Sequence, residues 1–391
     1  MRGIMSTMRG NTGAHWNPSD PIMNFDEIVD RRGTSSVKWD KYEGRDILPL
    51  WVADMDFRAP PPVIEALKKR IEHGIFGYTH APDELTGIVI SMLEAKYGWH
   101  IGRDAVLWLP GLVTGLNLAC RAAGGKNVIT AAPIYPPFLS APVHSGMTVS
   151  TAPLVLDKGK WVYDFHALEK AALPESRLFL LCNPHNPTGR IFDKNELSKI
   201  AGLCEKHDLI LCSDEIHCEI LLDREKRHVP IATLSPEIEH RTITLMAPSK
   251  TFNIPGLGCS FAVIPNPALR RRFLDAMAGI VPHVNALGLE AALAAYRDCG
   301  AWHDQLIEYL AKNRDLVEKM IPEMGLSMSH VEATYLAWID AGNIDRSAFE
   351  RAGVGLSDGA EFGSPGFVRL NFGCPRPMLE AALNRMESAL R

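Results

Sequence analysis

The sequence predicts an α/β protein with a large domain, built on a mainly parallel seven-stranded sheet covered by helices, and a smaller α+β domain. Two observations support this fold. Between residue 126 and about residue 264, short apolar runs alternate with helical patterns. From residue 286 the pattern changes to a long helical stretch followed by mixed signals. Strands that alternate with helices form βαβ units, whose parallel sheet is covered on both faces.

Five apolar runs of strand length carry the prediction of the large domain. They are "NVITAAP", "RLFLLC", "DLILCS", "RTITLMA" and "CSFAVIP", at residues 127–133, 177–182, 208–213, 241–247 and 259–265. Helical patterns such as "KNELSKIAGLCEKH" separate them. We predict a flexible N-terminal extension over residues 1–24, a large domain over 73–288, and a small domain formed by 25–72 together with 289–391.

In the predicted small domain, one helical stretch covers about residues 286–320. The runs "TYLAWID" and "GFVRLNFG" that follow it are typical of strands. The segment around residues 25–70 is expected to complete this domain, because 391 residues exceed what a single simple core accommodates.

Composition restricts the possible functions. The chain is 46% hydrophobic and 22% charged, which excludes wholesale disorder and a fibrous protein. Its net charge is −5 and its longest basic block is "RRR", so neither nucleic acid nor an anionic membrane is a favoured partner. No uninterrupted apolar run approaches the roughly 18 residues of a membrane span.

The eight cysteines form no C-x-x-C pair, and several lie within apolar runs, where a reduced thiol acts as a small hydrophobic group. This pattern favours a cytoplasmic location. The first residues lack the apolar core of a signal peptide, so we interpret them as an extension or as the product of a misplaced start.

Polar residues follow four of the predicted strands, and ligands of open α/β sheets bind outside the carboxyl ends of the strands. We therefore expect these residues to meet at one edge. In chain order they are Tyr135, Asn183 with Asn186, Asp214 with His217, and Ser249 with Lys250. Singly, each has an ordinary explanation as a surface lysine, a helix cap, a turn or loop packing. Their conjunction indicates a site.

The ligand that would use all four groups is a planar heteroaromatic aldehyde. An amine can form a Schiff base with the aldehyde, a carboxylate can hold a ring nitrogen protonated, an amide can bind a phenolic oxygen, and an aromatic ring can cover one face. These features describe pyridoxal 5′-phosphate. Its phosphate needs backbone N–H groups at a helix N-terminus, and Pro110-Gly111 precedes a helical run starting near Leu112.

The segments "NPHNPTG", "SDEIH", "SKTFNIPG" and "RLNFG" occur in the order and spacing of a known superfamily. From about Phe25 onward, the chain resembles the fold-type I pyridoxal-phosphate enzymes of the class I/II aminotransferase superfamily. The segments "FDEIVDRRGTSSVKWD", "LPLWVADMDF" and "HGIFGY" are similar to those of the MalY/PatB-type cystathionine β-lyases. This resemblance implies a carbon–sulfur lyase that converts a sulfur amino acid to pyruvate, ammonia and a thiol.

The resemblance also implies roles for residues that contact the cofactor ring. Lys250 matches the Schiff-base lysine and Asp214 the partner of the pyridine nitrogen. Asn186 matches the residue that binds the phenolic oxygen, with His217 near that oxygen where many relatives carry tyrosine. Tyr135 matches the aromatic residue that stacks on the ring.

Other matched positions concern the phosphate. Leu112 and Val113 match the positions whose backbone amides hold it, and Ser249 is expected to assist. Tyr78 matches a tyrosine that reaches the phosphate from the second subunit of a homodimer. Gly258 replaces an arginine that many aminotransferases use there. Ala247 replaces a common serine, and both departures favour the lyase branch.

The substrate α-carboxylate is expected to bind Arg369, with the backbone of Ala53 and the side chain of Asn186 nearby. An aminotransferase acting on an L-amino acid and a 2-oxo acid remains an alternative, because the same residues serve both reactions. A non-catalytic regulator that binds the cofactor or a metabolite is a second alternative. A dinucleotide-dependent oxidoreductase is disfavoured, since no G-x-G-x-x-G follows a predicted strand.

Overall fold

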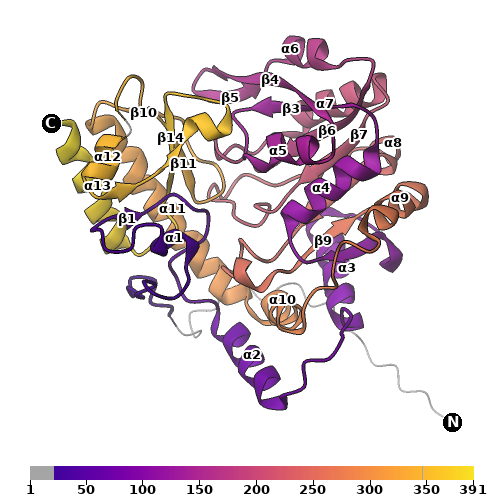
Figure 1. The fold of residues 1–391 in the computed structure, drawn as a ribbon, viewed down its shortest axis with the longest axis horizontal. Coiled ribbons are helices and arrows are strands. Elements are labelled where there is room, and N and C mark those ends of the chain that lie inside the picture. Colours follow the sequence, from indigo (N-terminus) through magenta and orange to yellow (C-terminus); the bar gives the residue numbers. More distant parts are fainter. Residues whose placement is uncertain (1–21, 346) are drawn as a thin grey trace.

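The computed structural model describes residues 22–345 and 347–391, and its largest sheet has eight strands (Figure 1). Most of the predicted N-terminal extension therefore lies outside the described residues. Across the sheet the order is β2 (Val106–Leu109), β9 (Ser260–Val263), β8 (Thr242–Met246), β7 (Ile210–Asp214), β6 (Ser176–Cys182), β3 (Asn127–Ala132), β4 (Thr148–Asp157) and β5 (Lys160–Tyr163). The five central strands from β8 to β4 run parallel, as predicted.

The eighth strand corrects the predicted number of seven. Strand β5 pairs antiparallel with β4 at the edge of the sheet. Lys158 and Gly159 join the two strands, and both have positive φ angles, 49° and 80°. Two such residues form the tight turn whose twist matches that of a β-hairpin, so the chain reverses here instead of entering a helix.

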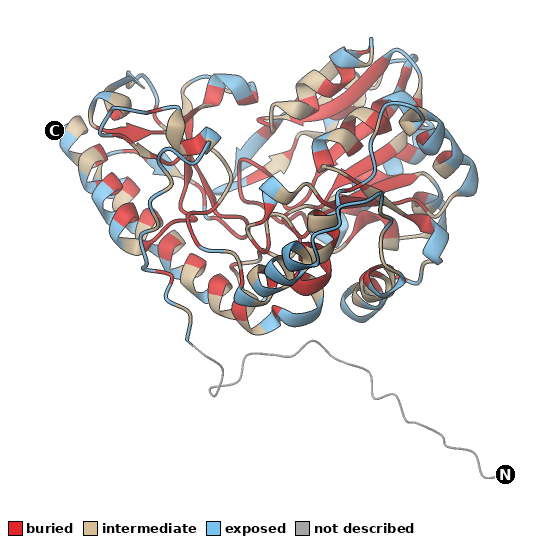
Figure 2. Cartoon of the chain, turned by 60° about the horizontal axis from the view of Figure 1, so that its bottom comes forward, coloured by how far each residue is buried: buried red, intermediate tan, exposed pale blue. Residues whose placement is uncertain are grey.

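Helices cover both faces of the large sheet, because successive residues of its central strands point to opposite sides. On β6, Leu178 and Leu180 pack in a cluster with helices α4 (Leu112–Ala123), α5 (Pro137–His144) and α9 (Pro267–Met277). Phe179 and Leu181 pack in another cluster with α6 (Phe165–Ala171), α7 (Lys194–Lys206) and α8 (Pro236–His240). Both faces are buried along the strands (Figure 2).

A four-stranded antiparallel sheet lies on the other side of the molecule (Figure 1). Its strands, in spatial order, are β10 (Ser327–Met328), β11 (Leu336–Asp340), β14 (Phe367–Asn371) and β13 (Ser357–Asp358). Helices α12 (Ser347–Arg351) and α13 (Arg376–Leu390) complete this region, and β1 (Leu48–Pro49) pairs with β12 (Val354–Gly355). The predicted strands "TYLAWID" and "GFVRLNFG" therefore form its centre.

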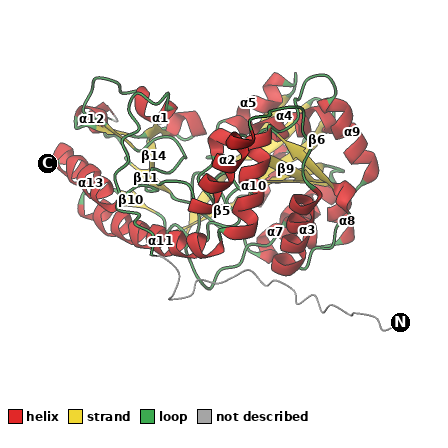
Figure 3. Cartoon of the chain, turned by 90° about the horizontal axis from the view of Figure 1, so that it is seen from below, coloured by secondary structure: helices red, strands yellow, loops and turns green. Residues whose placement is uncertain are grey.

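The predicted helical stretch at 286–320 consists of two helices, α10 (Ala286–Asp298) and α11 (Gly300–Glu323). They are separated at Cys299, whose φ and ψ angles of −110° and 18° are not helical. Helix α2 (Pro61–His73) packs against α10 (Figure 3). The remaining helices are α1 (Val37–Asp40) and α3 (Asp83–Tyr97).

Side chains of the N-terminal segment share one core with the C-terminal part of the chain. Phe25, Leu50 and Phe57 are buried in the same cluster as Leu306 of α11 and Leu370 of β14. The domain boundaries near residues 73 and 288 stay a prediction. No helix within the described ranges is long and apolar enough to cross a membrane.

Candidate active site

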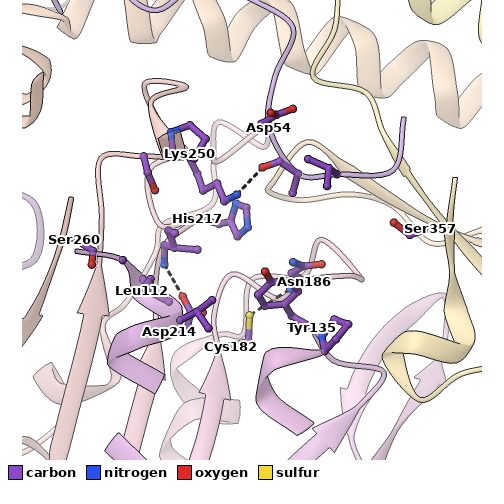
Figure 4. A pocket seen from close by; sticks show the side chains of 18 of the residues that line it. Asp54, Leu112, Tyr135, Cys182, Asn186, Asp214, His217, Lys250, Ser260 and Ser357 are labelled. Carbon is purple, nitrogen blue, oxygen red and sulfur yellow. Dashed lines mark hydrogen bonds between the residues drawn. The ribbon is translucent and has the colours of Figure 1, made fainter. Parts of the chain in front are cut away.

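The carboxyl ends of the central parallel strands open into one cavity of about 490 Å³ (Figure 4). The loop after β3 carries Tyr135, and the loop after β6 carries Asn186. Strand β7 ends at Asp214, and the turn after β8 carries Ser249 and Lys250. The predicted site residues that line this cavity are Ala53, Leu112, Val113, Tyr135, Asn186, Asp214, His217, Ser249, Lys250 and Arg369. Tyr78 and Asn183 do not line it, and Asn183 is buried with its side-chain oxygen accepting a hydrogen bond from the Phe192 amide.

Lys250 points from the β8 turn toward a segment that precedes the large sheet in sequence. Its Nζ donates a 2.5 Å hydrogen bond to the backbone oxygen of Ala53, which also accepts one from the Tyr335 hydroxyl at 2.9 Å. Burial lowers the pKa of Lys250 to about 8, although the nearby carboxylate of Asp54 acts in the opposite direction. A minor fraction of the amine is therefore already neutral near pH 7, far more than for an ordinary lysine, and a nucleophile or a base requires the neutral form.

Asp214 lies at the bottom of the cavity and is almost fully buried. Burial raises the pKa of Asp214 to about 7, against the effect of a 3.1 Å hydrogen bond that its Oδ1 accepts from the Ile216 amide. A cationic partner within reach would return this carboxyl group to its ordinary, ionised state. The site thus suits a ligand that presents a basic ring nitrogen to Asp214.

Two buried nitrogen atoms in the cavity have no hydrogen-bond partner among the described residues. One is Nδ1 of His217, a ring kept neutral by burial, which lowers its pKa to about 3. The other is Nε of Arg369. Buried polar atoms without partners are rare in folded proteins, so both positions fit a polar ligand.

The guanidinium group of Arg369 is held from three sides. It donates to Oδ1 of Asn186 at 2.9 Å and to the backbone oxygen of Trp51 at 2.8 Å. It also lies 4.7 Å from the ring centre of Phe362. A planar cation fixed in this way, with its Nε–H and one N–H of Nη1 free of partners among the described residues, can bind a carboxylate in a defined orientation.

The N-terminus of α4 forms a second anchoring point. The first hydrogen bond within this helix runs from Gly115 to Gly111, so the amide N–H groups of Leu112 and Val113 are free to bind a ligand. A Cβ atom at Gly258 would lie 2.9 Å from the backbone oxygen of Pro110, so a larger residue does not fit there without a shift. These free amides and the positive end of the helix dipole suit a phosphate group.

Sequence reasoning missed the side chains that fix the Trp51–Asp56 segment above Lys250. Asp54 lines the cavity, and its two carboxylate oxygens accept hydrogen bonds of 3.1 and 2.7 Å from Arg31. The backbone of the segment is held by the side-chain amides of Asn253 and Asn371. The motif "WVADMDF" marked the segment, but no local pattern indicated these partners, which lie far away in the sequence.

Tyr78 does not line the cavity of the single chain. It lies in the connection between α2 and α3 and is fully exposed. The nearby residues Ile75 and Phe76 are each exposed over more than half of their surface. The predicted role of Tyr78 needs a second subunit, and it stays a prediction.

Comparison with known proteins agrees with this geometry. Residues 45–386 match the family described as aminotransferase class I and II. The chain belongs to this family. It is 38% identical to cystathionine β-lyase PatB of Bacillus subtilis, over 94% of this chain and all of that protein. The predicted resemblance to the MalY/PatB-type proteins is therefore confirmed.

Two solved structures illustrate the match in three dimensions. The crystal structure of OvoB superimposes with a TM-score of 0.91 at 45% identity, over 94% of this chain and 99% of that one. Cystalysin from Treponema denticola, which contains a pyridoxal 5′-phosphate cofactor, gives a TM-score of 0.90 at 33% identity. That match covers 95% of this chain and 99% of cystalysin.

Proposed function

We propose that this family member is a pyridoxal-phosphate-dependent carbon–sulfur β-lyase. It would act on an L-amino acid with sulfur on Cβ, such as L-cystathionine, and release pyruvate, ammonia and a thiol. The observation that carries this proposal is the convergence of Lys250, Asp214 and Arg369 on one cavity, in a chain similar to PatB along nearly its whole length.

The residues present fit the cofactor. Lys250 would bind its aldehyde carbon, Asp214 its ring nitrogen, and Asn186 and His217 its phenolic oxygen. Tyr135 would cover one face of the ring. The amides of Leu112 and Val113, assisted by Ser249, would hold its phosphate. When bound, pyridoxal phosphate supplies an electron-accepting ring that stabilises negative charge at the substrate Cα.

The residues of this chain would position the substrate and move its proton. Arg369 binds the α-carboxylate through its free N–H groups and orients the Cα–H bond toward Lys250. The substrate amino group would first displace Lys250 from the aldehyde carbon, which frees its amine. The neutral amine of Lys250 then removes the Cα proton, and holding the two groups together makes this step intramolecular. The resulting ammonium group is stabilised by the backbone oxygen of Ala53 and by the charge of Asp54, both of which already face it. Asp214 keeps the ring nitrogen protonated.

We further propose a homodimer in which Tyr78 of one subunit completes the phosphate site of the other. The exposed apolar side chains of Ile75 and Phe76 support a contact at this connection, since such groups are stabilised when a partner covers them. All eight cysteines are free and buried, which supports a reducing, cytoplasmic location.

Product analysis with L-cystathionine tests the proposed reaction. A lyase forms pyruvate, ammonia and homocysteine in equal amounts without any co-substrate. Turnover that requires an added 2-oxo acid and produces no ammonia would instead identify an aminotransferase. A coloured protein that converts no amino acid of a broad panel would favour a non-catalytic regulator.

A further inference from the structure

Three acidic side chains line the active-site cavity: Asp54, Asp214 and Glu361. Asp54 has a hydrogen-bonded partner, and Asp214 has a proposed role in binding the cofactor. Both oxygens of Asp54 accept hydrogen bonds from Arg31. Asp214 is buried at the base of the cavity, where the cofactor ring is proposed to bind. Glu361 differs from both, because it is exposed and its carboxylate forms no hydrogen bond or ion pair within the described part of the chain.

The turn that carries Glu361 is fixed in place. It belongs to the short helix η4 (Gly359–Phe362), whose first turn is capped by a 2.8 Å hydrogen bond from the Ala360 amide to the Asp358 side chain. The backbone oxygen of Phe362 accepts a 3.0 Å hydrogen bond from the Ile134 amide, in the loop that carries Tyr135. This bond joins the turn to the loop at the carboxyl end of β3, so the backbone that carries Glu361 is held at the cavity.

Glu361 also lies close to the group proposed to bind the substrate carboxylate. Phe362, the next residue, packs under the guanidinium group of Arg369. Burial lowers the pKa of Arg369 to about 10, and Tyr135, Tyr335 and, to a smaller extent, Glu361 act against this lowering. A substrate held by Arg369 thus has an unpaired carboxylate within electrostatic range on the solvent side of the cavity.

We propose that Glu361 is a specificity-determining residue that selects substrates whose leaving group carries an ammonium group at its far end. This inference rests on the proposed lyase function. L-Cystathionine is such a substrate, because its sulfur bears a second amino-acid head beyond the bond that breaks. With the α-carboxylate at Arg369, the chain beyond Cβ can extend toward the cavity opening, where Glu361 offers the complementary charge.

Binding of two unreactive ligands to the holoenzyme tests this role. In L,L-2,7-diaminosuberate a methylene group replaces the sulfur of cystathionine, so there is no leaving group. L-2-Aminosuberate is identical except that it lacks the distal amino group. We expect the first ligand to bind up to about fivefold more tightly, as one partly exposed ion pair would allow. Glu361→Gln should abolish this preference, and Glu380→Gln, the same change on the exposed face of α13, should retain it.

Two results would overturn the inference: equal affinity for both ligands in the unmodified enzyme, or an unchanged preference in Glu361→Gln. Weaker binding of both ligands by the same factor in Glu361→Gln also counts against the inference, because the ratio of the two affinities then stays constant. Added salt should reduce the preference, because the ion pair is accessible to solvent. If L-cystathionine releases no pyruvate, the lyase reaction is wrong, and the binding ratio still decides the role of Glu361.

Discussion

The amine of Lys250 and the backbone oxygen of Ala53 are 2.5 Å apart, although 197 positions separate them in the sequence. This hydrogen bond joins the turn after β8 to the segment that also contacts Arg369 through the backbone of Trp51. The amine and the guanidinium group are therefore positioned by one short stretch of backbone. The contact makes the geometry of the Trp51–Asp56 segment part of the proposed catalytic apparatus.

Replacing Lys250 by alanine should lower kcat by at least the roughly 10²–10⁴-fold attributed to a positioned acid–base group. The variant should also fail to retain cofactor after borohydride treatment, because it lacks the amine that binds the aldehyde. Peptide mapping of the borohydride-treated protein checks the attachment site. Lys319→Ala, on the exposed face of α11, is the matched control. Label on any residue other than Lys250 would refute the assignment.

Arg369→Lys should reduce kcat/KM for L-cystathionine by about a hundredfold while keeping the positive charge. Lysine cannot donate two parallel hydrogen bonds to a carboxylate, and a hundredfold loss corresponds to about 2.7 kcal/mol, within the range for truncating buried charged pairs. Steady-state kinetics of the unmodified enzyme and of Arg369→Lys measure the change in kcat/KM, and a thermal melt of each protein shows whether the variant is folded. A variant with unchanged kcat/KM would show that another group binds the α-carboxylate.

Asp214 should make the stability of the cofactor-free protein depend on pH. Burial raises its pKa to about 7 from 3.8, so the native state binds more protons than the unfolded state between these values. The contribution of Asp214 to the free energy of unfolding should therefore fall as pH rises from about 4 to about 7, by up to a few kcal/mol. The buried rings of His185 and His217, whose pKa values are lowered to about 3, act in the opposite direction over much of this range. Urea unfolding at several pH values, compared between the unmodified protein and Asp214→Asn, isolates the contribution of Asp214 as the difference between the two slopes. Equal slopes in both proteins would contradict the prediction.

Tyr78 gives a test of the shared active site. Tyr78→Ala and Lys250→Ala should each be nearly inactive when purified separately. After unfolding and refolding together, mixed dimers should regain activity, because one of their two sites then contains an intact Tyr78 from one chain and Lys250 from the other. Activity assays of the mixture, with each variant refolded alone as the control, measure this. A mixture as inactive as its components would exclude a contribution of Tyr78 across subunits.

Several features of the fold could be predicted because they depend on neighbouring residues. Short apolar runs separated by helical patterns identified the central strands, and the rule that ligands bind beyond their carboxyl ends brought Tyr135, Asn186, Asp214 and Lys250 to one edge. The hairpin turn at Lys158-Gly159 was missed, since its conformation depends on two positive φ angles within a polar run. The end of α10 at Cys299 was missed as well, because the helical pattern continues through it.

The sequence alone therefore determined the parallel sheet, the family and the residues at the strand ends, since burial and turn preferences act over a few neighbouring positions. Only the tertiary structure decided that Ala53 accepts a hydrogen bond from Lys250 and that Arg31 occupies both oxygens of Asp54. It also decided that Glu361 lines the same cavity as Arg369 and has no partner among the described residues. These relationships join residues distant in the chain. The packing of the two sheets around a common cavity fixes these relationships, and local sequence patterns do not predict that packing.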